Sequence, residues 1–312
     1  MPKFQPKTEI SWPEGRSFAF TIFDDTDLST LKNIKPVYSF LEELGFRITK
    51  SVWPIRGNQE AKIRGATCEE LDYLNWVKTL QDKGFEIGLH SATFHTSQRA
   101  QTLSGIKRFH ELFGHWPKTI AFHLDNQENL YWGDYRLTGF KRHLYNFLAR
   151  GKRYNYFRGH IEQDPLFWGD VCKQRIEYVR NFVFGDINTL NKCPFMPYHD
   201  PKRPFVNWWF ASTEGASVEP FNKSISEPNQ DRLEQERGAC IMYTHFAKGF
   251  FMNGGLDSRF KILMKRLSQK NGWFVPVSTL LDYLKKINGE HIITPLERMQ
   301  LELNWLMHKF TF

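Results

Sequence analysis

Hydrophobic positions along the chain follow two alternating periods, and the first of them predicts a buried strand. Residues 16–23 are almost continuously apolar and rich in β-favouring side chains, a pattern typical of a strand that is covered on both faces. Residues 34–44 then space apolar side chains three or four positions apart and stop at Gly45, which predicts an amphipathic helix. Residues 46–52 return to a strand-like pattern. The chain therefore opens with a strand–helix–strand unit.

The same order repeats through the next part of the chain. Residues 69–83 form a second predicted helix, residues 85–89 a third strand and residues 118–124 a fourth. Thr96 or Ser97 can cap the helix between the last two strands, because a hydroxyl accepts hydrogen bonds from the first free amides of a helix. Strands and helices that alternate in this way predict parallel strands joined by right-handed crossovers.

The middle of the chain, residues 126–238, is less regular. Residues 136–150 and 167–182 look helical, and residues 203–212 resemble a strand. Long loops rich in Pro and aromatic residues separate them. Loops of this length in one domain usually carry function or insertions.

The regular order returns in the last quarter. A strand is predicted over 239–244, a helix over 256–270, a strand over 273–277 and a helix over 278–287. The segment after residue 290 has an apolar helical stripe through Leu296, Met299, Leu303 and Leu306. No repeat or linker divides the chain, so we expect a single domain over residues 1–312.

Composition and charge exclude few classes of protein, but they bear on the kind of partner that the chain binds. The chain has 312 residues, of which 41% are hydrophobic and 16% aromatic, and its formal net charge is +8. The Lys and Arg residues are dispersed without a block of like charges, which argues against a nucleic-acid face and favours a solvated basic surface. An anionic substrate or an anionic membrane surface is the alternative.

Four cysteines without metal or disulfide spacing, no signal peptide and no membrane-spanning run predict a cytoplasmic protein. Attachment to the surface of a membrane stays compatible with this pattern.

Candidate chemistry gathers where predicted strands end. Asp24, Asp25 and Asp27 follow the first strand. The other polar clusters are His90 with His95 after the third strand, His123 with Asn126 after the fourth, and His245 after the strand at 239–244. Because the carboxyl ends of parallel strands share one face of a barrel or sheet, we expect these clusters to converge on one pocket.

A carboxylate with two imidazoles is the ligand set of a catalytic divalent metal. Such a metal polarises a carbonyl and makes hydroxide available near neutral pH. A second carboxylate can act as the general base, and a further histidine can protonate the leaving group. The sequence therefore predicts metal-assisted hydrolysis of an amide or ester.

These residues resemble the polysaccharide deacetylases of the NodB-homology type, also called carbohydrate esterase family 4. The string Thr21-Ile-Phe-Asp24-Asp25 is similar to the family's Thr-Phe-Asp-Asp motif with one extra residue, and His90-Ser-Ala-Thr-Phe-His95 resembles its His-Ser/Thr-x-x-His motif. The strand that ends in His245 is similar to its late histidine motif. The resemblance implies a distorted (β/α)7 barrel with a C-terminal amphipathic helix, residues 290–312, that covers it.

The resemblance also implies roles for single residues. Asp24 would be the catalytic base and His245 the proton donor, and Asp25, His90 and His95 would hold one divalent metal ion. Zinc is the first choice of metal, with cobalt, manganese or nickel as alternatives. Asp27 keeps a helix-capping or supporting role.

Some residues depart from the family's pattern. His90 and His95 stand five positions apart instead of four, so His123 is an alternative second histidine ligand. The family's Arg-x-Pro-Tyr motif is missing, and His123 or Asn126 are candidates to replace its arginine. Asp170, in Trp168-Gly169-Asp170, is a candidate for the missing Asp-x-x-Asp-Trp motif. Trp132 and Arg158 are further candidates for substrate binding.

The expected function is the removal of an N- or O-linked acetyl or formyl group from a sugar or polysaccharide precursor in surface-polysaccharide or lipopolysaccharide assembly. The carbohydrate substrate could be phosphorylated or lipid-linked. Two alternatives stay open. One is a carbohydrate-binding relative with a decayed metal site. The other is a glycosyltransferase that uses Asp25-Thr26-Asp27 as a DxD motif.

Overall fold

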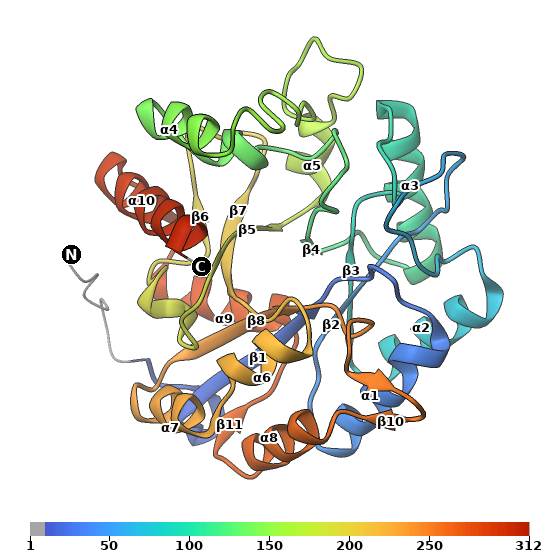
Figure 1. Ribbon diagram of the computed structural model, residues 1–312, viewed down its shortest axis with the longest axis vertical. Helices are drawn as coiled ribbons and strands as arrows, with labels where there is room; N and C mark the ends of the chain where they lie inside the picture. The colour runs from blue at the N-terminus through green and yellow to red at the C-terminus, as the bar shows by residue number, and fades with distance from the viewer. Residues whose placement is uncertain (1–9, 312) are drawn as a thin grey trace.

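Seven parallel strands close into a barrel in the computed structural model, which describes residues 10–311 (Figure 1). Each strand pairs in parallel with the next, and the last pairs with the first. In ring order the strands are β1 (Phe18–Asp24), β2 (Thr49–Val52), β3 (Glu86–Leu89), β4 (Thr119–Ile120), β5 (Tyr178–Phe184), β7 (Trp208–Thr213) and β8 (Ala239–Thr244). The predicted (β/α)7 barrel is confirmed. Its distortion lies in the two-residue β4 and in a register shift between β5 and β7.

Short strands extend the ring at two places. β11 (Gly272–Trp273) pairs with the start of β1, and β6 (Tyr198–His199) pairs antiparallel with β7. β12 (His291–Ile292) adds to β6, while β9 (Phe251–Met252) and β10 (Gly255–Leu256) form a separate hairpin.

The helices surround the ring of strands (Figure 1). In chain order they are α1 (Leu31–Glu43), α2 (Leu71–Asp82), α3 (Arg99–Phe113), α4 (Phe140–Leu148), α5 (Gly169–Arg175), α6 (Val218–Ser224), α7 (Glu227–Gln235), α8 (Ser258–Ser268), α9 (Val277–Asn288) and α10 (Pro295–Thr311), with 3-10 turns η1 (Pro13–Gly15), η2 (Gly133–Arg136) and η3 (Thr189–Asn191). Among residues 10–311, none of the helices combines the length and the apolar character needed to cross a membrane.

The structure differs from the expected elements mainly in the middle of the chain. The segment 167–182 is not one helix, because α5 ends at Arg175 and β5 begins at Tyr178. Residues 178–184 (YVRNFVF) are rich in aromatic residues and valine, which favour a strand over a helix. Helices α6 and α7 occupy a stretch for which no element was predicted.

The N-terminus of α3 and the buried face of α10 also differ from the prediction. Neither Thr96 nor Ser97 caps α3, whose N-cap is Gln98 without a side-chain bond. On α10 the buried apolar residues are Leu301, Trp305 and Leu306, while Leu296 and Met299 are exposed. The helix packs against α4 and β5 with this face, so the aromatic Trp305 replaces the expected aliphatic stripe.

A buried ion pair joins β1 and β2 on the outer side of the barrel wall. Asp24 and Lys50 are register partners, so their side chains point to the same face. Lys50 Nζ donates to Asp24 Oδ2 at 2.8 Å, and Tyr38 of α1 donates to the same oxygen at 2.9 Å. The amide of Phe246 donates to the other oxygen. Because both charged side chains are fully buried, each needs the opposite charge of the other to be stable inside the protein.

Replacing Lys50 by Met should lower the free energy of unfolding by about 3–5 kcal/mol, because Asp24 is left as a buried carboxylate without its cation. Urea denaturation followed by circular dichroism measures this change. Arg259→Met, which breaks an exposed pair with Glu227, is the control and should change stability little. The double variant Asp24→Asn/Lys50→Met should be more stable than Lys50→Met, and equal stability of the two would contradict the interpretation.

Candidate functional site

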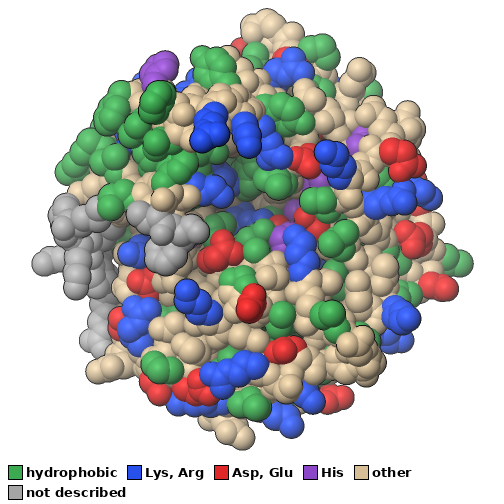
Figure 2. Space-filling view, in the orientation of Figure 1, with side chains coloured by type: hydrophobic (Ala, Val, Ile, Leu, Met, Phe, Trp, Pro, Cys, Tyr) green, Lys and Arg blue, Asp and Glu red, His purple; other side chains and the backbone are tan. Residues whose placement is uncertain are grey.

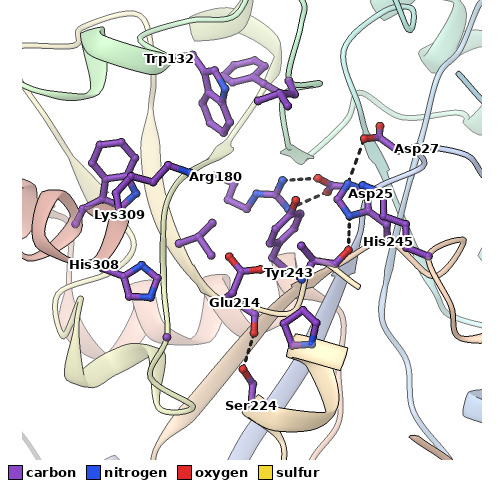
Figure 3. A pocket seen from close by; sticks show the side chains of 18 of the residues that line it. Asp25, Asp27, Trp132, Arg180, Glu214, Ser224, Tyr243, His245, His308 and Lys309 are labelled. Carbon is purple, nitrogen blue, oxygen red and sulfur yellow. Dashed lines mark hydrogen bonds and ion pairs between the residues drawn. The ribbon is translucent and has the colours of Figure 1, made fainter. Parts of the chain in front are cut away.

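A cavity of about 740 Å³ opens at the carboxyl ends of the barrel strands (Figures 2 and 3). Its walls include residues within or directly after β1, β3, β4, β5, β7 and β8, as α/β barrels place their sites. Side chains that can ionise line it: Asp25, Asp27, His90, Arg136, Arg180, Glu214, Lys223, Tyr243, His245, Lys248, His308 and Lys309. The strand-end clusters predicted to converge therefore meet at one pocket through Asp25, His90 and His245.

Asp24 and Asp25 point in opposite directions, because side chains alternate along a strand. Asp24 faces outward, where Lys50, Tyr38 and the Phe246 amide occupy its carboxylate. It does not line the cavity. Asp25 follows at the strand end and faces the cavity (Figure 3). The carboxylate that the resemblance offered as a base is thus a structural anchor in this geometry, and the next one reaches the site.

Asp25 is held by a buried arginine from the opposite wall. Arg180 of β5 donates to both oxygens of Asp25, at 2.8 and 2.5 Å, in a bidentate pair. Its guanidinium also lies 4.4 Å from the Tyr243 ring centroid. Burial alone would raise the pKa of Asp25, but Arg180 and His90 hold it below its usual value. Asp25 therefore stays ionised and fixed in position.

Asp27 lies at the centre of three imidazoles. Its Oδ1 is 3.0 Å from His90 Nε2 and 3.6 Å from His123 Nε2, and its Oδ2 is 3.2 Å from His245 Nε2. Burial alone would raise the pKa of Asp27, but hydrogen bonds from His245 and His90 hold it well below its usual value. Thr30, not Asp27, caps α1. Asp27 therefore does not cap this helix, and it lines the cavity instead.

The tautomer of His123 follows from its neighbours. The amide nitrogen of Asn126 donates to the Thr93 carbonyl and to Glu128, so the amide oxygen faces His123 and can only accept a proton. It lies 3.0 Å from His123 Nδ1. Nδ1 therefore carries the proton, and Nε2 presents a lone pair to Asp27 with no hydrogen-bond partner among residues 10–311. Burial lowers the pKa of His123, which favours this neutral form.

His245 has the same arrangement. Its Nδ1 lies 2.7 Å from the Ala216 carbonyl oxygen, which can only accept, so the proton sits on Nδ1 and Nε2 faces Asp27 (Figure 3). A neutral His245 would thus turn a lone pair towards a carboxylate. Such a contact is favourable only with a proton or a cation between the two atoms.

The side chains around Asp27 are of the types that bind a divalent metal. Ligand atoms of one zinc ion lie about 3–3.5 Å apart when the bonds are about 2.1 Å, and Asp27 Oδ1 lies 3.0 and 3.6 Å from the two histidine nitrogens. In the described range 10–311, no three His, Cys, Asp or Glu side chains surround a common point as ligands do. A cation would take the place of the contacts between Asp27 and the imidazoles.

A second layer holds the imidazoles in place. Trp53 packs against both His90 and His123, with ring centroids 5.5 Å apart in each case. Glu128 accepts from Asn126 and from the Ser97 amide. Burial raises the pKa of Glu128 to about 8. Metal-binding histidines commonly depend on such outer hydrogen bonds for their orientation.

His95 lies outside this cluster. Its Nε2 accepts from the Asn58 amide at 3.1 Å, and its Nδ1 donates to the Thr96 carbonyl at 2.8 Å. Both ring nitrogens are therefore occupied within a loop. Of the two histidines considered as the second ligand, the structure brings His123 to His90 and leaves His95 apart.

Among the candidates for substrate binding, Trp132 lines the cavity (Figure 3), and Asn126 orients His123 from behind. Arg158 does not reach the cavity, because it pairs with Asp164 and Gln127. Asp170 pairs with Arg99 on an exposed surface. The structure therefore gives neither of them a place in the pocket, and Asp170 does not replace the missing family motif there.

Several functional side chains were not identified from the sequence. Arg180 was placed in a predicted helix, although the aromatic and valine residues of 178–184 favour a strand. Tyr243 and Glu214 lie at the ends of strands, as the histidines do, so the same reasoning could have identified them. Arg136 and Lys309 lie in irregular or C-terminal segments and carry no comparable signal.

No family model matches the chain, and no curated protein matches it. Similar solved structures include a Mycobacterium smegmatis protein assigned to the polysaccharide deacetylases, at 11% identity over 93% of this chain and 98% of that one, with a TM-score of 0.48. PuuE allantoinase shares 11% identity over 88% and 92%, with a TM-score of 0.47.

A family 4 acetyl xylan esterase from Clostridium thermocellum, solved in complex with a cobalt ion, shares 10% identity over 88% of this chain and 92% of that one, with a TM-score of 0.41. Solved structures similar to this chain thus include polysaccharide deacetylases, the family whose motifs the sequence resembles. At such low identities and TM-scores, these likenesses carry no inference about what this chain binds or catalyses.

Arg180→Met should reverse the way in which Asp25 makes the free energy of unfolding depend on pH. In the wild type the pKa of Asp25 is lowered, so its contribution is present above about pH 4 and is lost as the pH falls through the folded-state pKa. Without Arg180, burial dominates and raises this pKa, so the variant should lose less stability relative to wild type at pH 5 than at pH 7.

Urea unfolding of both proteins at the two pH values measures the difference. We expect a loss of about 3–5 kcal/mol at pH 7 and a smaller one at pH 5. A loss that is the same at both pH values would show that Arg180 does not control the charge of Asp25.

Proposed function

We propose that the protein is a metal-dependent hydrolase that removes an acyl group from a carbohydrate. The observation that carries this proposal is the orientation of the imidazoles around Asp27. His123 and His245 each give their Nδ1 proton to a fixed acceptor, and both turn Nε2 towards the carboxylate of Asp27. A buried carboxylate that faces ring nitrogens with lone pairs is an electrostatic arrangement that a cation stabilises.

Asp27, His90 and His123 would hold the metal, with zinc as the first choice and cobalt, manganese or nickel as alternatives. When bound, such an ion polarises the acyl carbonyl and makes hydroxide available near neutral pH. If Nε2 of His90 binds the ion, its proton sits on Nδ1, which faces Asp25 Oδ1 at 4.0 Å. This ring orientation agrees with the role proposed for Asp25.

Asp25 is the proposed general base. It is ionised, it lines the cavity, and its bidentate pair with Arg180 sets the direction of its carboxylate. The same pair lowers its basicity, which is a cost for proton abstraction. Arg180 therefore acts as a positioning residue, which trades base strength for a fixed geometry.

His245 is the proposed proton donor. In its charged form Nδ1 donates to the Ala216 carbonyl and Nε2 to Asp27, so the protein supplies an acceptor for each proton. When the leaving nitrogen or oxygen of a substrate approaches Nε2, that proton can pass to it. The role expected from the sequence for His245 is kept in this proposal, while the base moves from Asp24 to Asp25.

The shape of the cavity agrees with a sugar-sized ligand. Its volume of about 740 Å³ lies within the range of about 300–1,000 Å³ that is common for small-molecule sites. Trp132 lies on one wall (Figure 3), and the edge of an indole can contact the apolar face of a sugar.

Metal analysis of the purified protein tests the proposed ligands. We expect one equivalent of zinc, cobalt, manganese or nickel, and loss of at least nine-tenths of it in Asp27→Asn and in His123→Ala, because each removes a donor. His95→Ala is the matched control, since His95 is a histidine of the same loop region that lies outside the cluster, and it should keep its metal. A wild-type protein that binds none of these ions would refute the proposal and favour a binding module.

Activity separates the proton donor from the metal ligands. His245→Gln should lower kcat for the release of acetate or formate from acylated sugars by about 10²–10⁴-fold, while its metal content stays at the wild-type level. Acyl release is followed by an enzyme-coupled assay for the free acid. A His245→Gln protein that keeps full activity, or that loses its metal, would contradict the assigned role.

A further inference from the structure

Arg136 is a buried cation on the cavity wall, away from the Asp27 cluster. It ends the turn η2, lines the cavity and is 9% exposed. Its guanidinium carbon lies 3.3 Å from the ring centroid of Trp132 and 5.3 Å from that of Trp305. Cation–π contact with two indoles fixes the plane of the guanidinium.

Arg136 differs from the other buried arginines in lacking a carboxylate. Arg180 pairs with Asp25, and Arg203 pairs with Asp200 and Glu302. Within residues 10–311, no carboxylate contacts the Arg136 guanidinium, and its Nε has no hydrogen-bond partner. Burial, together with the charge of the nearby Arg180, lowers the pKa of Arg136 to about 9. An unpaired charge in such a place costs stability.

A second cation lies nearby. Lys309 of α10 lines the same side of the cavity (Figure 3), and burial together with the charge of Arg136 lowers its pKa. Lys223 and Lys248 also line the cavity. Glu214 is the nearby acid, and one of its oxygens accepts from the Ala216 amide. Positive charge therefore exceeds negative charge on this side of the pocket.

We propose that Arg136 and Lys309 form a subsite for an oxyanion, a phosphate or a carboxylate, carried by the substrate. This inference rests on the proposed function in one respect, because it takes the cavity as the place where the acylated carbohydrate binds. The guanidinium, in contact with two indoles, can offer its N–H groups to an oxyanion as a fork. The ligand then supplies the negative charge that the protein does not provide.

The two ends of the cavity would thus recognise two groups of one molecule. Figure 3 shows Trp132 and Lys309 on the side of the cavity away from Asp27 and His245. The acyl group would lie at the imidazoles and the oxyanion at Arg136. A neutral acylated sugar would fill only the first of these places.

Inorganic phosphate and acetate, each titrated calorimetrically into the full chain at low salt, test the subsite directly. We expect at least one of them to bind to the wild type, and its dissociation constant to rise at least tenfold in Arg136→Met and at least threefold in Lys309→Gln. Tight binding of phosphate alone points to a phosphorylated substrate, and comparable binding of acetate to a carboxylate. Arg175→Met is the matched control, because Arg175 also stacks on an indole, Trp116 at 4.3 Å, but lies outside the cavity.

The variant His123→Ala separates this inference from the proposed function. It should bind the probe as the wild type does, whether or not it holds a metal, because His123 is part of the other end of the cavity. If the wild type shows neither metal nor activity, but Arg136→Met still binds the probe more weakly than the wild type, the proposed function fails and the subsite stands. If neither probe binds to the wild type, or Arg136→Met binds as tightly as wild type, the subsite is refuted.

Thermal unfolding distinguishes ligand binding from a structural role. Met keeps the contact with both indoles and removes the unpaired charge, so Arg136→Met should unfold at a temperature no lower than the wild type. A clear fall in its midpoint would show that Arg136 serves the fold and would contradict the proposal. The loss of probe binding in Lys309→Gln remains decisive if Arg136→Met does not fold.

Discussion

The two-residue period of β1 is the constraint on which the site depends. Because neighbouring side chains on a strand face opposite sides, Asp24 and Asp25 cannot share one environment. Each carboxylate meets its own buried cation, Lys50 outside the barrel and Arg180 inside it. A register shift of one residue would exchange the two faces and remove the inner carboxylate from the cavity. The stability of the barrel wall and the composition of the site thus follow from the same strand.

Order in the site is maintained by groups that surround the imidazoles. Asn126 and the Ala216 carbonyl each hold the Nδ1 proton of one histidine, and Trp53 limits the rotation of two rings. Glu128 and Thr93 fix Asn126 in turn. Buried polar networks of this kind are stable only when each member is satisfied, and here Nδ1 of His90 and Nε2 of His123 lack a hydrogen-bond partner among residues 10–311.

Sequence periodicity predicted the barrel well where local and tertiary preferences agree, as in residues 16–125 and 239–287. It predicted the strand-end histidines His90 and His245 for the same reason. It assigned both Asp24 and Asp25 to the site, although side chains alternate along a strand and only Asp25 of the two lines the cavity. It also missed Arg180 and Arg136. The acid that pairs with Arg180 is 155 positions away in the chain, and Arg136 lies in an irregular segment, so neither role leaves a local pattern.

The closure of the ring has a consequence for folding. β1 and β8 pair although more than two hundred residues separate them in the chain, and a contact so distant in sequence forms late and slowly. Asp27 and His245 stand on the two sides of this seam, so they meet only when it closes. A partly folded chain therefore lacks the assembled cluster, and the chemistry of the pocket would appear in step with completion of the barrel.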